Sequence, residues 1–169
     1  DVYVAMWNGS FGSAMSAQGT IKIAIPLVIN ALAVTLAFKM KFWNIGGEGQ
    51  VLIGGLAAAA CMICLDDKMP GGLVILCMVL ASIAAGAVWG LIPAFFKAKW
   101  NTNETLSTLM MNYIATQLVA FFTIVWEVPK GSGKIGIINQ DTNLGWLPQA
   151  FGSKYLLSII VAVLVTLFM

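Results

Sequence analysis

Long apolar runs separated by short polar stretches set the pattern of this chain. Charged side chains are absent from five runs, at residues 23–38, 49–65, 73–96, 105–126 and 155–169. A helix needs about 20 apolar residues to cross the hydrocarbon core of a bilayer, and these runs approach or exceed that length. A membrane β-barrel would show segments of about 10 residues with alternating polarity, and none of the runs alternates. The pattern therefore predicts an all-α, polytopic transmembrane helix bundle with five spans.

The composition agrees with this pattern. Hydrophobic residues make up 60% of the chain and charged residues 9%, whereas soluble domains carry about a quarter charged residues. The lysines form no basic tract that would follow a phosphate backbone, so we expect no nucleic acid partner. We interpret residues 1–169 as a single transmembrane domain. Because the chain starts at Asp1 without a signal region and stops early in its last apolar run, we expect a fragment truncated at both ends.

Metal binding and catalysis find little support in the residues. Cys61, Cys64 and Cys77 all lie in apolar runs, and the chain has no histidine and no second CxxC pair. The usual zinc ligand sets are therefore missing, and free cysteines pack readily as small hydrophobes. The chain also lacks a Walker-type nucleotide motif and paired carboxylates within a run. We expect no metal site and no catalytic residue.

Two short basic turns predict the orientation. Lys39 and Lys41 form one turn, and Lys97 and Lys99 form the other. Lysines in short loops are retained on the cytoplasmic side. With an alternating path, the long connection at residues 127–154, which is rich in glycine, asparagine and proline, becomes an extracytoplasmic loop.

The run at residues 73–96 carries small side chains at helix-packing spacing. Ser82, Gly86 and Gly90 recur every four residues. Small residues at this spacing let two membrane helices approach closely, either within one subunit or against a second subunit. Pro93 then predicts the end of this helix.

The run at residues 105–126 carries a polar stripe. Its members share one helical face and are Thr105, Thr108, Asn112, Thr116 and Thr123. A polar stripe on a membrane helix faces protein or water rather than lipid. Two interpretations stay open: hydrogen bonds between helices, and one wall of a solute path.

The polar stretch before the second run predicts a broken helix. Gly46, Gly47 and Gly49 disfavour a continuous helix there. We expect an irregular entry followed by a helix that begins around Glu48, with Asn44 as its cap. Irregular backbone at membrane depth needs protein or a water-filled cavity around it. The interior is therefore the predicted location of Asn44, Glu48 and Gln50.

Glu48 itself has two possible roles. In the first turn of a helix its charge complements the positive end of the helix dipole. It then acts either as a structural clamp that bonds backbone amides or as a direct contact for solute, since an ionisable residue within a span indicates function.

Two segments carry a family resemblance. FWNIGGEGQVLIGG at residues 42–55 resembles the FNIGxEGQxLxGA signature of permease subunits of bacterial ABC importers. NETLSTLMMNYIA at residues 103–115 resembles the NEVxxTLMLNYIA motif of the nucleoside and basic-membrane-protein-linked branch. That superfamily also includes branched-chain amino acid and ribose permeases. Trp43 departs conservatively from the usual phenylalanine or leucine.

The resemblance implies a permease subunit that imports nucleosides across the bacterial cytoplasmic membrane. It implies a separate ABC ATP-binding subunit that holds ATP and Mg²⁺, so that this chain needs no cofactor and is no enzyme. It also implies a second permease subunit, identical or paralogous, and an extracytoplasmic substrate-binding lipoprotein. The cytoplasmic coupling segment of the family lies in its later half, so we assign it to no residue here.

A nucleoside path needs uncharged hydrogen-bonding groups and aromatic faces. Aromatic faces are available from Trp43, Trp89 and Tyr113. As hypothetical path residues we name Asn44, Glu48, Gln50, Asn112, Tyr113 and Thr116. The alternatives are an ABC permease for a simple sugar or a branched-chain amino acid, and an ion-coupled secondary carrier. A coupled carrier would keep several ionisable residues near the midplane, where this chain offers only Glu48.

Overall fold

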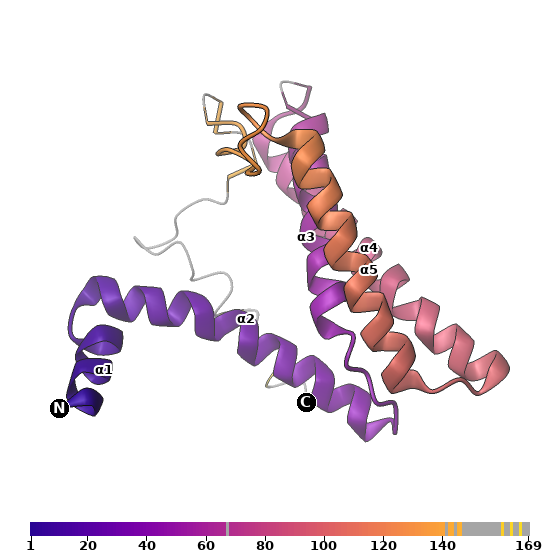
Figure 1. Cartoon of the computed structure of the whole chain (residues 1–169). Helices are drawn as coiled ribbons and strands as arrows, with labels where there is room; N and C mark the ends of the chain where they lie inside the picture. The colour runs from indigo at the N-terminus through magenta and orange to yellow at the C-terminus, as the bar shows by residue number, and fades with distance from the viewer. Residues whose placement is uncertain are drawn as a thin grey trace. The chain divides into compact units, whose positions relative to one another are not determined.

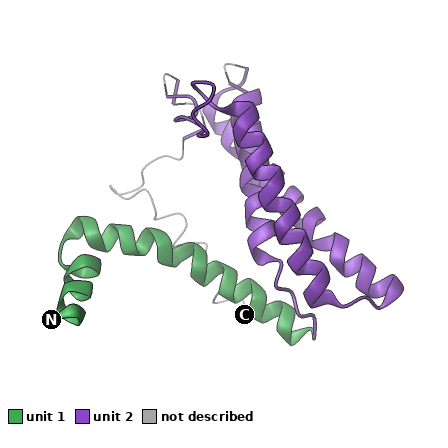
Figure 2. Ribbon diagram, viewed as in Figure 1, with its two compact units in different colours: residues 1–40, 148–169 green, residues 41–147 purple. Residues whose placement is uncertain are grey.

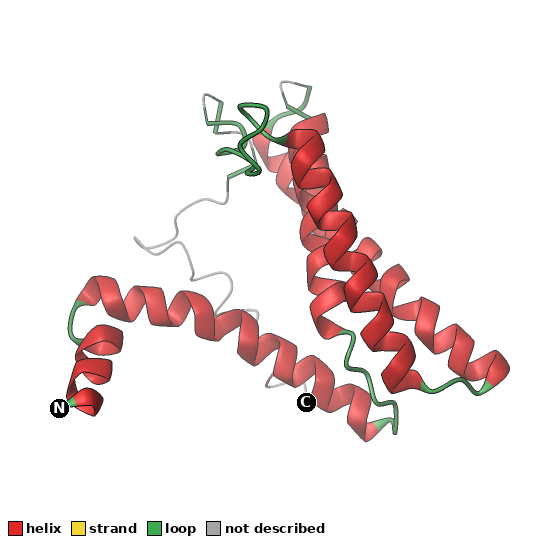
Figure 3. Ribbon diagram, in the orientation of Figure 1, coloured by secondary structure: helices red, strands yellow, loops and turns green. Residues whose placement is uncertain are grey.

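A computed structural model of the chain describes residues 1–66, 68–140, 142, 143, 145, 146, 160, 163 and 166. These residues form helices joined by loops and include no strand (Figures 1 and 3). The helices are α1 Val2–Phe11, α2 Ala14–Lys39, α3 Gly47–Cys64, α4 Gly71–Trp100 and α5 Glu104–Trp126. Within the described part, α2 to α5 are long and apolar enough to cross a membrane. The predicted all-α, polytopic fold is confirmed.

The chain divides into two compact units (Figure 2). Unit 1 comprises Asp1–Met40 and Pro148–Met169, and unit 2 comprises Lys41–Leu147. The fifth predicted span, 155–169, lies outside the described residues apart from three helical positions, 160, 163 and 166.

In unit 1, α2 begins earlier than the charge-free run that predicted it. Ser13 is the N-cap, and its Oγ accepts the N–H of Ser16 at 3.1 Å. The hydroxyl of Thr20 also donates to the carbonyl of Ser10 at 2.9 Å and so ties α2 to the end of α1. The predicted run began at residue 23, directly after Lys22. A single lysine interrupts a charge-free run, but it does not interrupt a helix, and α2 continues through it. Capping chemistry, not charge, sets the start of α2.

In unit 2, α3, α4 and α5 pack together, and a tight connection joins the last two. Asn101 ends α4 in the left-handed conformation with φ 49°, and Asn103 begins α5 by accepting the N–H of Leu106 at 3.2 Å. Lys97 and Glu104 close the connection with an ion pair of 2.8 Å. Two asparagines, one at each helix end, therefore define this turn.

Pro93 does not end α4, so that prediction is wrong. It lies inside the helix, which continues to Trp100. A proline removes one backbone hydrogen bond, and neighbouring groups in a membrane helix can satisfy the freed carbonyl. The helix ends instead where Asn101 adopts a positive φ, which a non-glycine residue inside an α-helix cannot do.

The first part of the predicted loop at 127–154 folds around one carboxylate. The Glu127 oxygens accept the N–H groups of Gly131 at 2.6 Å and Gly133 at 2.9 Å. Both glycines have positive φ, 86° and 64°, which turns their N–H groups toward the carboxylate. These two bonds, led by the one from Gly131, hold the pKa of Glu127 below its ordinary value against the opposing effect of burial.

The next part of the loop lies against the ends of α3 and α4. Asn139 Nδ2 donates to the carbonyl of Met62 at 3.0 Å. A Cβ on Gly145 would stand 3.1 Å from side-chain atoms of Met62 and Met78. These contacts hold the described part of the loop against the bundle. Its last predicted part, 147–154, lies outside the described residues.

Candidate functional site

The polar stretch before α3 is irregular, as predicted, and crosses to α5. Asn44 Oδ1 accepts the N–H of Gly46 at 2.8 Å and so folds the chain back just before the helix. The N–H of Ile45 donates to the hydroxyl of Thr108 on α5 at 3.2 Å. Gly46 is the N-cap of α3 and makes no side-chain cap bond. Asn44 therefore shapes the approach to the helix without capping it, which corrects the predicted cap.

Asn112 supplies the missing cap from a different helix. Its Oδ1 accepts the N–H of Gly49 in the first turn of α3 at 2.9 Å, and its Nδ2 donates to the carbonyl of Ile45 at 3.0 Å. Only 7% of Asn112 is exposed. One side chain on α5 thus satisfies an orphan N–H of α3 and also fixes the segment that leads into it. Below, this arrangement is the α3–α5 junction, made by Ile45, Gly49, Thr108 and Asn112.

Thr108 completes the junction one turn before Asn112. It is fully buried. Its hydroxyl donates to the carbonyl of Glu104 at 2.8 Å, and its oxygen accepts from Ile45. A threonine hydroxyl often bonds a carbonyl of its own helix, so it brings an acceptor to the helix surface at little cost. The junction therefore joins α3 to α5 through neutral groups only.

The junction requires a glycine at position 49. A Cβ there would stand 2.7 Å from Asn112 Oδ1 and 3.2 Å from Asn112 Cα. Trp89 of α4 also approaches, with its Nε1 at 3.2 Å from the same point. The bare backbone lets α5 come near enough to cap α3, which gives a physical reason for one glycine of the GGEG sequence.

Trp89, one of the aromatic residues suggested for a solute path, turns its indole N–H toward α3. Its N–H is buried and has no hydrogen-bond partner among the described residues. The indole nitrogen points to the first turn of α3, beside Gly49. An unpaired buried donor costs free energy, so Trp89 meets α3 through packing beside Gly49 and not through a hydrogen bond to the described residues.

The small residues of α4 lie against α3. A Cβ on Gly90 would stand 2.6 Å from Gln50 Nε2, and one on Gly86 would stand 3.4 Å from the Gln50 carbonyl. The carbonyl of Ser82 lies 3.2 Å from the Cβ position of Gly54. The structure therefore places Ser82, Gly86 and Gly90 in a contact within this chain, with the Gln50 side chain over Gly90.

The polar stripe of α5 divides into two kinds of residue. Thr108 and Asn112 form hydrogen bonds to the α3 segment. Thr116 donates to the Asn112 carbonyl at 3.0 Å, and Thr123 donates to the Val119 carbonyl at 2.8 Å, both within α5. The first half of the stripe thus matches the interhelical interpretation. In the second half, the threonine hydroxyls bond carbonyl groups of α5 itself.

Glu48 differs from its prediction. It does stand in the first turn of α3, but it is exposed in unit 2 and bonds no backbone amide of the described residues. Within unit 2, Glu48 therefore has neither the expected interior position nor the clamp role. Asn112 takes the clamp role because a neutral amide can both donate and accept, whereas an ionised carboxylate only accepts. Tyr113 and Thr116 are also exposed.

Similarity to known proteins places the chain in a family of transport proteins. Residues 16–169 match the family described as "Branched-chain amino acid transport system / permease component". The chain belongs to this family. The match includes both the irregular entry to α3 and its partner helix α5, so the α3–α5 junction lies wholly inside the family region. The permease chain is a multi-pass membrane protein.

Several curated proteins are similar to this permease. It is 35% identical over 170 residues to the guanosine ABC transporter permease protein NupP of Bacillus subtilis, covering 99% of this chain and 48% of the relative. It is 34% identical over 121 residues to the glucose ABC transporter permease protein TsgB13 of Haloferax volcanii, covering 72% and 31%. It is 33% identical over 112 residues to the nucleoside ABC transporter permease protein NupB of Lactococcus lactis, covering 66% and 30%.

The chain spans at most about half the length of these curated relatives. No solved structure matches it. Among the described residues, no group of three or more metal-ligating side chains comes together.

Proposed function

We propose that this chain is part of a permease subunit of an ATP-driven importer in the bacterial cytoplasmic membrane, and that the importer translocates nucleosides. The observation that carries the proposal is the similarity to a guanosine permease over nearly the whole chain, junction included. A separate ABC ATP-binding subunit binds ATP and Mg²⁺ and hydrolyses the nucleotide. A second permease subunit and an extracytoplasmic substrate-binding lipoprotein complete the importer. The permease chain itself needs no cofactor.

The six predicted path residues fall into two groups within this proposal. The exposed residues Glu48, Tyr113 and Thr116 contact the solute or its water. By contrast, Asn44, Gln50 and Asn112 hold the wall in place through contacts with backbone or helix α4. A nucleoside offers an aromatic base and ribose hydroxyls, which suit a phenol ring, a hydroxyl and a carboxylate acceptor.

Import of a simple sugar is the second candidate, because a glucose permease is nearly as similar over the part that it covers. Sugar hydroxyls need the same acceptors but no aromatic face for a base. Tyr113 therefore separates the candidates: Tyr113→Leu should weaken nucleoside uptake if a base stacks there, and should leave sugar uptake nearly unchanged.

The test is uptake by proteoliposomes that contain the full-length permeases, with and without the ATP-binding subunit. Radiolabelled guanosine, uridine and glucose are offered through the binding protein. ATP-dependent uptake of a nucleoside supports the proposal. Concentrative uptake by the permeases alone, or uptake that follows an ion gradient after ATP depletion, would overturn it in favour of a secondary carrier.

A further inference from the structure

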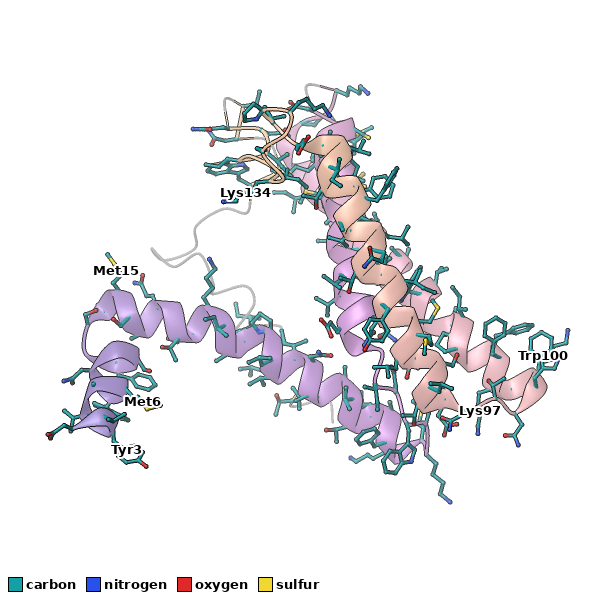
Figure 4. The ribbon with its side chains drawn as sticks, in the orientation of Figure 1. Tyr3, Met6, Met15, Lys97, Trp100 and Lys134 are labelled. Atoms are coloured by element: carbon teal, nitrogen blue, oxygen red, sulfur yellow. The ribbon has the colours of Figure 1, made fainter. Side chains whose placement is uncertain are left out.

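The last turns of α4 expose three aromatic rings beside two lysines. We name the group Phe95, Phe96, Lys97, Lys99 and Trp100 the α4 foot. Figure 4 shows Lys97 and Trp100 at the C-terminal end of α4, whose last turns project away from α3. Trp100 is 58% exposed and Phe95 is 55% exposed. Aromatic rings beside lysines at the end of a membrane helix are typical of the boundary between membrane and water.

The length of α4 locates the foot relative to a bilayer. With its 30 residues and a rise of about 1.5 Å per residue, α4 is about 45 Å long. The hydrocarbon core is about 30 Å thick, which leaves about 15 Å of α4. This length corresponds to about 10 residues that reach the boundary of the core or lie outside it. The lysines, which avoid hydrocarbon, stand at the C-terminal end. That end therefore leaves the hydrocarbon, and the foot falls at headgroup depth.

The rings of the foot form one cluster. The centroid of Trp100 lies 5.8 Å from that of Phe95, edge to face, and 5.6 Å from that of Phe96. Lys99 Nζ lies 4.9 Å from the Trp100 centroid and 5.7 Å from the Phe95 centroid. The ammonium group is thus held against the rings, where cation–π attraction orients it.

The two lysines of the foot differ in their available charge. Lys97 forms an ion pair of 2.8 Å with Glu104, so its charge is balanced within the protein. Lys99 has the ring contacts but no carboxylate partner among the described residues. Its three N–H donors thus remain for an anionic group from outside the protein.

We propose that the α4 foot binds the headgroup of an anionic phospholipid. Lys99 donates to the lipid phosphate, and the rings of Phe95 and Trp100 lie at the boundary between headgroups and acyl chains. Tryptophan prefers that depth because its ring is apolar and its indole N–H is polar. The interaction anchors the projecting end of α4 to the membrane surface.

The test uses the full-length permease in nanodiscs of phosphatidylcholine, alone or mixed with phosphatidylglycerol, with bromine on the acyl chains of one lipid at a time. Bromine quenches tryptophan fluorescence at contact distance. Part of the tryptophan fluorescence that bromine quenches in the wild-type protein should be absent from Trp100→Phe. Bromine placed on the acyl chain close to the headgroup should quench that part more than bromine placed deeper. A variant that keeps Trp89 as its only tryptophan is the matched control on the same helix. Trp89 is less exposed than Trp100 and lies beside Gly49 of α3, so headgroup bromine should quench it less than it quenches Trp100.

The lysine is tested by the preference for the charged lipid, measured as quenching by brominated phosphatidylglycerol relative to brominated phosphatidylcholine. Lys99→Ala should lower this preference about fivefold, the effect of one lysine near an anionic surface. Lys134→Ala, in the exposed loop after α5, should leave it unchanged. Absence of quenching at Trp100 in folded protein would mean that protein covers the foot. Equal preference in wild type and Lys99→Ala would overturn the anionic site.

Discussion

Two side chains of unit 2 each organise a segment by accepting backbone N–H groups, one within the helices and one outside them. Asn112 accepts the N–H of Gly49 and donates to Ile45 inside the bundle. Glu127 accepts the N–H groups of Gly131 and Gly133 just after α5 ends. The first is a neutral amide and the second an ionised carboxylate.

The difference follows from the surroundings. A charged carboxylate at membrane depth costs roughly 2.5–3.5 kcal/mol on translocon-insertion scales, whereas one at the water boundary stays hydrated in part. An amide avoids that penalty and offers a donor and an acceptor together. The junction is therefore held at any pH that keeps the protein intact, while the loop at Glu127 depends on acid–base equilibrium. The variants below test this contrast.

Asn112→Leu should have the largest effect. It leaves the buried N–H of Gly49 without its acceptor, at about 1–3 kcal/mol, and it also removes the donor to the part-buried carbonyl of Ile45. The midpoint of thermal unfolding in detergent and the yield of assembled complex should both fall. Thr116→Val is the matched control on the same helix, because its hydroxyl bonds only the Asn112 carbonyl; its effect should lie within about 0.5 kcal/mol. Equal stability of the two variants would contradict the junction.

Gly49→Ala should rank second. The new methyl group would stand 2.7 Å from Asn112 Oδ1, and overpacking of this kind costs about 1–3 kcal/mol. Gly55→Ala on the same helix is the control, since within the described part of the chain no atom of another element lies within 4 Å of its Cβ position. That change should stabilise α3 by about 0.5–1 kcal/mol through helix propensity. Thermal unfolding measures both, and opposite signs are expected.

Gly90→Ala should have a smaller effect, although its Cβ position lies only 2.6 Å from Gln50 Nε2. The atom in the way is the end of a flexible side chain, which can rotate, whereas Asn112 at the junction is fixed by two bonds. A loss below about 1 kcal/mol is expected. A loss as large as that of Gly49→Ala would show that Gln50 is as rigid as Asn112.

The smallest effect on the bundle is expected from Glu127→Gln, which acts on the loop. Because the pKa of Glu127 is lowered in the folded loop, its bonds contribute fully above the ordinary pKa of a carboxyl group. That contribution is lost as pH falls through the lowered pKa. A spin label at Ser132→Cys, in a background without the native cysteines, should become mobile in acid in the parent protein. With Glu127→Gln it should be mobile at neutral pH and respond little to acid.

Much of the fold follows from local sequence. The charge-free runs predicted α3, α4 and α5 because burial in lipid leaves few alternatives to helix. The glycines at 46, 47 and 49 predicted an irregular entry, and α3 does begin at Gly47. The sequence did not reveal α1, since residues 2–11 include polar side chains and are too short for a span. It also misplaced the end of α4, because the end depends on the φ of Asn101 and not on Pro93.

The site was less accessible to sequence reasoning. The cost of an asparagine in lipid indicated that Asn112 needs a partner, but the identity of that partner depends on a contact with Gly49, 63 residues away. Glu48 was one candidate for the clamp because it lies in the first turn of α3, where local capping rules apply. A cap that arrives from another helix has no local signature. The prediction that the polar residues of α5 share one helical face was correct. Which of them form hydrogen bonds to the α3 segment depends on how α3 packs against α5.

The origin of that cap has a consequence for how the protein is made. The segment containing Gly49 leaves the ribosome before Asn112 does, and 63 residues separate them. At 5–20 residues per second, the delay is about 3–13 s. During this interval the first turn of α3 lacks the acceptor that Asn112 later provides for the N–H of Gly49. The boundary of α3 is completed only when α5, two helices later in synthesis, is delivered beside it.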